Sequence, residues 1–282
     1  MQKSKILGLG AVVLMAAGLA ACGGNEGSEN QDVEIDSFAF NQVLKSASRN
    51  YLLKIDGDDH YLNISARIAW PEKLGHADIA QLQDSLASYT FGDSIYATPD
   101  EAIINFIDGI HDLKNYFDEI DEISVVDSIP SDQPAFIMRS EAEMTDVNEE
   151  YVTYTVTNSQ YLGGAHGEVM QFPFTYDLEH ANVLTASDYF LPGHEKEVLD
   201  IIKQSLADQM GTIPEHLAKM GIFAYDNVGV GMPYIKGETL FIHYNIYEIA
   251  PYAAGQFDIP VSSVLISPYL RPEVKTLIGY DY

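Results

Sequence analysis

Two short segments carry the residues best suited to chemistry in this chain of 282 residues. The first, Tyr161–Gly167, reads YLGGAHG. Its glycines allow backbone angles that other residues avoid, and they let another backbone segment or a ligand approach closely. The second, Leu240–Gly255, is a strand-like run followed by a tyrosine-rich turn bounded by proline and glycine. Tyrosine joins a large apolar body to a polar tip, which binding surfaces favour. The candidate binding residues are therefore Gly163, Gly164, His166, Gly167, Tyr244, Tyr247, Glu248 and Tyr252.

Acid–base catalysis is one use of these segments, because His166 with Glu248 or nearby acids could serve a hydrolase or deacetylase if these groups lay within hydrogen-bond reach. The sequence has no GxSxG motif to supply a serine nucleophile. It also has no HExxH motif or close histidine pair, so we expect no metal and no other cofactor. Two simpler roles stay open: a tight turn with His166 packed locally, and Glu248 capping backbone N–H groups. We assign no catalytic residue.

The first residues of the chain are typical of a secreted precursor. Lys3 and Lys5 precede an apolar run, Ile6–Ala21, that is too short and too rich in glycine and alanine for a membrane-spanning helix. The run ends in Leu-Ala-Ala before Cys22, the sole cysteine, and this motif resembles the bacterial lipobox. We therefore predict a signal peptide over 1–21 and a lipid on Cys22. The lipid would anchor the protein to the cell envelope, at the outer membrane on its periplasmic or surface side.

Acidic residues dominate the charge of the chain. Fifteen basic and 42 acidic residues give a formal net charge of −27. Cleavage after residue 21 removes two lysines and no acids, so the mature charge is 13 − 42 = −29. Such a charge repels nucleic acid and anionic membrane surfaces and favours a cationic partner or divalent ions. High solubility is the simpler reading of the same charge. With a single cysteine, no disulfide can form within the chain.

Hydrophobic periodicity predicts both helices and strands along the chain. Residues 22–40 are polar and glycine-rich, which predicts a flexible tether. A hairpin turn is expected at Gly57–Asp59, and a capped helix start at Thr98-Pro99. The predicted strands cover 51–55, 61–68, 135–144, 151–161, 169–176, 228–234, 240–247 and 256–259. The predicted helices cover 76–90, 98–117 and 193–211, with short ones after Pro214 and within 260–270, and residues 118–132 are expected to be a helix end or a loop.

Helices and strands are segregated rather than alternating, which favours an α+β fold. Short connections between successive strands favour antiparallel pairing. We expect antiparallel sheets with helices packed on one face, in two consecutive subdomains over 41–165 and 166–282.

Several of these segments, in this order, resemble one known family. They are Gly163–Gly167, the LTASDYF stretch Leu184–Phe190, Tyr244–Gly255 and the ending Asp258–Pro260. Together they resemble the paired extracytoplasmic domains of unknown function of the PdaC/RsiV type, which are found in lipoproteins, beside a peptidoglycan deacetylase and in a lysozyme-sensing anti-sigma factor. The Ala69-Trp70-Pro71 motif and the helix carrying residues 103–105 resemble the first of the two domains.

The resemblance implies an α+β pair of domains without known catalytic residues, PdaC-like over 41–165 and RsiV-like over 166–282. In the anti-sigma member the outer part binds lysozyme, a basic enzyme. We therefore predict an envelope-anchored, non-catalytic binding module for a cationic, lysozyme-like protein or for cell-wall glycan. The alternatives are an envelope hydrolase or deacetylase acting on peptidoglycan or another polysaccharide, and a structural or assembly lipoprotein.

Overall fold

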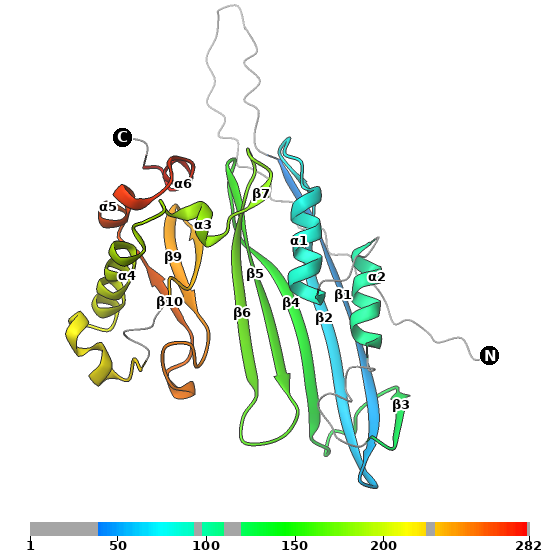
Figure 1. Cartoon of the computed structure of the whole chain (residues 1–282). Helices are drawn as coiled ribbons and strands as arrows, with labels where there is room; N and C mark the ends of the chain where they lie inside the picture. Colours follow the sequence, from blue (N-terminus) through cyan, green and yellow to red (C-terminus); the bar gives the residue numbers. More distant parts are fainter. Residues whose placement is uncertain (1–38, 93–97, 110–119, 224–228, 281–282) are drawn as a thin grey trace, which may run out of the picture.

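The computed structural model describes residues 39–92, 98–109, 120–223 and 229–280. It contains a seven-stranded sheet in the order β3-β1-β2-β4-β5-β6-β7 and a three-stranded sheet in the order β10-β9-β8 (Figure 1). Helices accompany both sheets, which confirms the mixed α and β composition expected from the sequence. The predicted signal peptide, Cys22 and the tether up to residue 38 lie outside the described residues.

The longest strands form a hairpin at the start of the fold. β1 (Phe40–Ile55) pairs antiparallel with β2 (Asp58–Leu74). The two residues between the strands, Asp56 and Gly57, both have positive φ, at 52° and 84°. A two-residue turn of this kind matches the right-handed twist of the flanking strands. The hairpin expected near Gly57 is present, and β1 begins eleven residues earlier than the apolar alternation indicated.

Two helices cover one face of the large sheet (Figure 1). They are α1 (Ala80–Phe91) and α2 (Pro99–Asp108). The Thr98 hydroxyl accepts a hydrogen bond from Glu101 N at 3.2 Å, as expected for an N-cap followed by proline. Leu82 and Leu86 of α1 and Ile103 and Ile107 of α2 join the buried side chains of the sheet in one core. α2 ends at Asp108 with Gly109 as its C-cap, so it is shorter than the predicted helix over 98–117. Residues 110–119 lie outside the described part.

One pairing in the large sheet departs from the antiparallel expectation. β3 (Glu122–Val126) runs antiparallel to β1, but β4 (Ala135–Val147) runs parallel to β2. The long connection through α1, α2 and β3 makes this possible, because parallel neighbours need a long crossover. β3 itself was not predicted, since it is a five-residue edge strand in an acidic stretch that we expected to be a helix end or a loop.

The large sheet continues past the predicted subdomain boundary at 165/166. β5 (Tyr151–Tyr161), β6 (Glu168–Asp177) and the short β7 (Asn182–Val183) extend it as an antiparallel meander. Because β6 pairs with β5 along its whole length and β7 pairs with the end of β6, the large sheet ends at Val183. Alternate residues of β5 serve two cores, with Val152 and Tyr154 facing the helices and Tyr151 facing the C-terminal residues.

The C-terminal subdomain surrounds the small sheet. β8 (Met232–Lys236), β9 (Thr239–Tyr244) and β10 (Phe257–Pro260) pair antiparallel. The main helix, α4 (Glu195–Gln209), packs against β10 and buries Val198, Ile202 and Leu206. The remaining short helices are α3 (Ala186–Tyr189), η2 (Pro214–Met220), η3 (Tyr252–Ala254), α5 (Ser263–Ile266), η4 (Ser267–Tyr269) and α6 (Pro272–Leu277).

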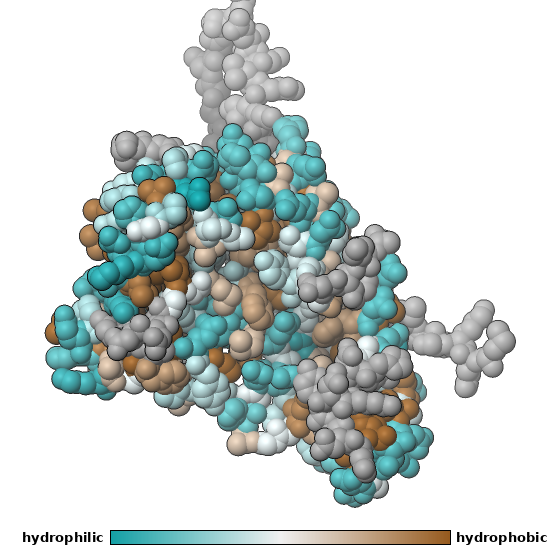
Figure 2. Space-filling model, in the orientation of Figure 1, coloured by the Kyte–Doolittle hydropathy of each residue, from teal (hydrophilic) through white to brown (hydrophobic). Residues whose placement is uncertain are grey.

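The surface seen in Figure 2 is mainly hydrophilic, with hydrophobic residues showing in patches between. No helix in the described ranges is both long enough and apolar enough to cross a membrane.

Candidate functional site

The two segments singled out in the sequence meet in the folded protein. Tyr161–Gly167 forms the turn between β5 and β6, and the Tyr244–Gly255 segment connects β9 to β10. The rings of His166 and Tyr252 are stacked, with centroids 3.9 Å apart and planes 20° apart. The Tyr252 hydroxyl donates a hydrogen bond to the Gly167 carbonyl at 3.0 Å. The turn of one subdomain is therefore fastened to the loop of the other.

The glycines of the turn serve two different needs. Gly163 and Gly164 have φ of 97° and 89°, a region that side chains disfavour. Gly167 is required for space instead, because a Cβ there would lie 2.8 Å from the Gln160 carbonyl oxygen. Both uses of glycine expected from the sequence are thus present, at different positions.

A groove of about 360 Å³ lies between the two segments. It is lined by Gln160, Leu162, Gly163, His166, Gly167, Glu168, Ile246, Tyr247 and Tyr252. The Tyr247 side chain is 53% exposed, and its ring centroid lies 5.7 Å from that of Tyr252. An exposed aromatic wall with the Glu168 carboxylate beside it can bind a cation through the ring faces and the negative charge.

A second hollow of about 400 Å³ adjoins this groove, since Gln160 and Glu168 line both. The Gln160 side-chain amide donates a hydrogen bond to Glu168 at 2.7 Å, so the shared wall is a fixed polar pair. The far part of the second hollow includes Tyr89, Phe172 and Arg139. The two hollows together run from the loop of the C-terminal subdomain to helix α1.

Tyr244 and Glu248 occupy structural positions beside the groove. The Tyr244 hydroxyl donates to the Gly229 carbonyl at 2.7 Å, and burial raises the pKa of this hydroxyl. The Glu248 carboxylate accepts a hydrogen bond from Asn245 N at 2.8 Å. Glu248 therefore caps a backbone donor, which is the simpler of the two roles open to it in the sequence.

The geometry does not join His166 and Glu248 into an acid–base pair. His166 Nδ1 lies 3.1 Å from the Gly167 carbonyl oxygen, and its ring is stacked on Tyr252. Within the described residues no hydrogen bond or ion pair links the two side chains, and no cluster of three or more metal-binding side chains occurs.

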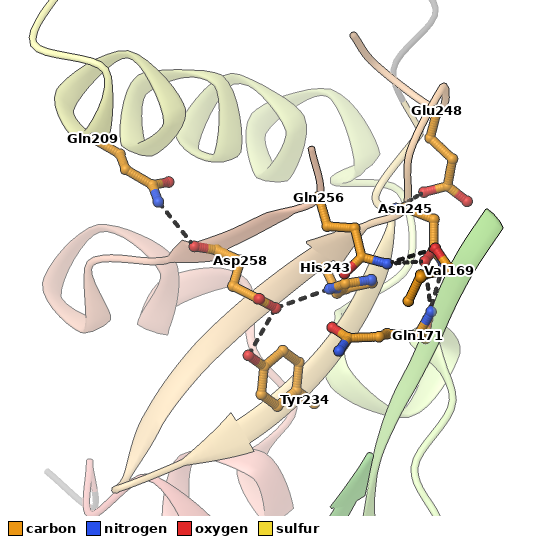
Figure 3. Close-up of polar contacts among 9 residues, drawn as sticks. All are labelled: Val169, Gln171, Gln209, Tyr234, His243, Asn245, Glu248, Gln256 and Asp258. Carbon is orange, nitrogen blue, oxygen red and sulfur yellow. Dashed lines mark hydrogen bonds and ion pairs between the residues drawn. The ribbon is translucent and has the colours of Figure 1, made fainter. Parts of the chain in front are cut away.

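Asn245 joins the two subdomains behind the groove, a role that the sequence did not reveal. Its side-chain oxygen accepts from Gln171 N at 2.7 Å, and its amide donates to Gln171 O at 2.8 Å (Figure 3). Gln256 donates to Val169 O at 3.0 Å on the same strand. Side-chain amides thus satisfy backbone groups on the edge of β6 where no further strand pairs.

A polar triplet inside the small sheet was also missed. His243 is 1% exposed, and its Nδ1 lies 2.9 Å from Asp258 Oδ1. The Tyr234 hydroxyl donates to the same oxygen at 2.9 Å (Figure 3). Alternation along β9 and β10 could have suggested the pairing, since His243 and Asp258 are cross-strand partners.

Taken together, the fold and the groove define a two-subdomain α+β protein with loops from both parts around a shared hollow. Residues 187–263 match the family model described as a protein of unknown function, DUF3298. This segment covers most of α3, all of α4 and the whole three-stranded sheet.

Two solved structures share the fold. The chain is similar to a member of the DUF3298 family from Bacteroides fragilis NCTC 9343, with 21% identity and a TM-score of 0.67, over 86% of this chain and 98% of the other. It is also similar to a DUF3298 family protein from Pseudomonas aeruginosa PAO1, with 16% identity and a TM-score of 0.54, over 85% and 97% of the two chains. No curated protein matches the chain.

Proposed function

We propose that the protein is an envelope-anchored, non-catalytic binding module that holds a cationic group of a partner protein in the groove between the two subdomains. The observation that carries this proposal is the exposed aromatic wall of Tyr247, Tyr252 and His166 with Glu168 beside it. A lysine or arginine side chain fits such a wall through cation–π attraction and charge. The net charge of −29 on the cleaved chain adds long-range attraction for a basic protein such as lysozyme.

The test measures binding of the purified chain to lysozyme. Tyr247→Ala should raise the dissociation constant about tenfold, as expected for an exposed aromatic anchor. The control, Leu265→Ala, removes an apolar residue of similar exposure on α5, outside the groove, and should leave binding unchanged. Raising the salt from about 50 to about 300 mM should slow association. The proposal is contradicted if lysozyme does not bind, or if it binds equally well after Tyr247→Ala and at both salt concentrations.

Cell-wall glycan is the second candidate ligand, because the adjoining hollow makes the groove long. Tyrosine, amide and charged side chains all line it, namely Tyr247, Gln160, Glu168, Arg139 and Tyr89. In a peptidoglycan sedimentation assay, a bound glycan chain predicts that Tyr89→Ala and Tyr247→Ala both weaken binding. A cationic protein side chain held in the first groove predicts an effect of Tyr247→Ala alone.

The membrane anchor is tested separately by mass spectrometry of the N-terminal peptide from envelope fractions. An acyl-modified Cys22 at the new N-terminus is the expected result. An intact thiol in cytosolic protein would overturn the anchoring half of the proposal.

A further inference from the structure

A separate cavity lies at the opposite end of β6 from the aromatic groove. Glu168 begins this strand at the groove, and Asp177 ends it at the cavity, so the two sites are roughly 30 Å apart along ten residues. The cavity has a volume of about 900 Å³, within the range of small-ligand sites. Its walls come from the ends of β2 and β6, the β4–β5 turn and helix α6, and therefore from both subdomains.

Two lysines line this cavity together with five acidic residues, so groups of both signs face a bound ligand. Lys73 from β2 and Lys275 from α6 both line it. Across the described ranges, neither lysine forms an ion pair with a carboxylate of the protein. Two ammonium groups from different subdomains thus remain available to an anionic ligand group.

His180 lines the same cavity and is cationic when its imidazole is protonated. Asp177, whose side chain is only 3% exposed, accepts through Oδ1 from the backbone N–H groups of Glu179 and His180, and its Oδ2 lies 2.8 Å from His180 Nδ1. The hydrogen bond and charge of Asp177 raise the pKa of His180, which favours the imidazolium form. With Nδ1 held by Asp177, Nε2 is the ring nitrogen left to donate to a ligand.

The remaining lining is of two further kinds. The exposed carboxylates of Glu149, Glu179 and Glu273 can hold a ligand ammonium group. The buried side chains of Leu74, Leu178 and Leu277 form an apolar floor. A ligand that pairs with the basic, acidic and apolar side chains of this cavity is a short molecule with a negative group, a positive group and small apolar groups.

We propose that this cavity binds a short peptide with free ends. Lys73, Lys275 and His180 take the C-terminal carboxylate, the glutamates take the N-terminal ammonium group, and apolar side chains of the peptide rest on the leucine floor. This site uses no residue of the aromatic groove, and it does not depend on the lipid anchor.

Isothermal titration of the full chain with tetra-alanine tests the site. Tetra-alanine with free termini should bind, and acetylating its amine or amidating its carboxyl group should each weaken binding at least tenfold. The variant Lys73→Met with Lys275→Met should weaken binding to the same degree, because it removes both charges while keeping most of the length of the two side chains. His180→Gln should weaken it less, since both lysines remain.

The charge-matched control replaces Lys196 and Lys219 with methionine, since neither lysine lines the cavity. This control should bind like the unchanged chain, and so should Tyr247→Ala, which separates this site from the aromatic groove. Thermal unfolding midpoints confirm that each variant is folded. The proposal is overturned if no form of tetra-alanine binds the unchanged chain, or if the fully capped peptide binds as well as the free one.

Discussion

At the scale of single residues, Asp258 shows how a partly exposed carboxylate can organise a buried group. One of its oxygens receives hydrogen bonds from both His243 and Tyr234. Burial by itself raises the pKa of Asp258, but the hydrogen bond and charge of His243, with the Tyr234 hydrogen bond, outweigh it and hold this pKa below its usual value. The ionised carboxylate is therefore the form that stabilises the folded state.

Replacing Asp258 with asparagine should lower the free energy of unfolding at pH 7 by about 1 kcal/mol, because the side chain is nearly half exposed and solvent weakens charged hydrogen bonds there. A carboxyl group whose pKa is lowered by folding contributes stability above its unfolded value, about 3.9, and loses it as the pH falls through the folded value. The difference between variant and unchanged chain should therefore shrink below pH ~4.

Urea denaturation across pH measures this difference. Asp132→Asn, in the exposed turn before β4, is the control and should stay within about 0.5 kcal/mol of the unchanged chain. A difference at pH 7 that persists undiminished under acidic conditions would contradict the role given to the carboxylate.

At the scale of elements, the β5–β6 turn shows why glycines that look alike in a sequence differ in cost. Gly164 has a positive φ, but a Cβ there would meet no atom within 4 Å. A Cβ at residue 167 would clash with the backbone oxygen of Gln160. A backbone atom cannot move aside as the end of a flexible side chain can. The Gly167 carbonyl holds the Tyr252 hydroxyl, so a shift at Gly167 also moves the groove wall.

Gly167→Ala should therefore destabilise the fold more than Gly164→Ala, by about 2 kcal/mol against about 1 kcal/mol. Chemical denaturation gives both values, and near-ultraviolet circular dichroism should report a changed tyrosine environment only for Gly167→Ala. Equal losses in the two variants would show that space at residue 167 is not limiting.

The helices and strands that the sequence predicts correctly are those whose apolar residues recur at a regular spacing. Helices α1 and α4 and the strands of the β4–β6 meander have buried stripes that match their period, and proline and a capping threonine mark the start of α2. The first half of β1, with Lys45, Ser46 and Ser48, lacks alternation, because pairing with β2 rather than burial holds it. β3 is an edge strand with Val125 63% exposed, so its pattern carries little signal.

At the scale of the whole molecule, the two subdomains are joined by polar groups as well as by side-chain packing. Asn245 holds the edge of β6, and on the face of the same sheet the Thr153 hydroxyl donates to Ile235 O at 2.6 Å. The Thr175 hydroxyl accepts from Ile235 N at 2.8 Å. Both the backbone N–H and the carbonyl of Ile235 on β8 are thus hydrogen-bonded to threonine hydroxyls of the large sheet.

Asn245→Ala should lower the free energy of unfolding by about 2–4 kcal/mol, since it leaves a backbone N–H and a carbonyl of Gln171 without their partner. Asn245→Asp should also destabilise, because a carboxylate can accept from Gln171 N but cannot donate to Gln171 O. Hydrogen exchange of the Gln171 amide provides a local measurement. Asn41→Ala, which removes an exposed hydrogen bond to Glu72, is the matched control and should change stability little.

The candidate groove was accessible to sequence reasoning because its residues lie in two short segments of unusual composition, and the fold brings those segments together. The junction and the large cavity were not accessible. Asn245 and Gln171 are 74 residues apart, and the cavity gathers Lys73, Asp177 and Lys275 from elements spread over the chain. A contact between two polar residues far apart in the chain produces no periodic pattern in the sequence, so the sequence does not reveal it.

The parallel pairing of β2 with β4 has a consequence for how the chain reaches this structure. The β1–β2 hairpin and the β4–β6 meander can each form from near neighbours, but Tyr61 must find Ala135 to unite them. Closing the loop between Tyr61 and Ala135 has an entropic cost, which is offset only after many residue pairs of β2 and β4 have formed. The rate-limiting step of folding is therefore expected to be the joining of these two preformed halves along a single strand seam.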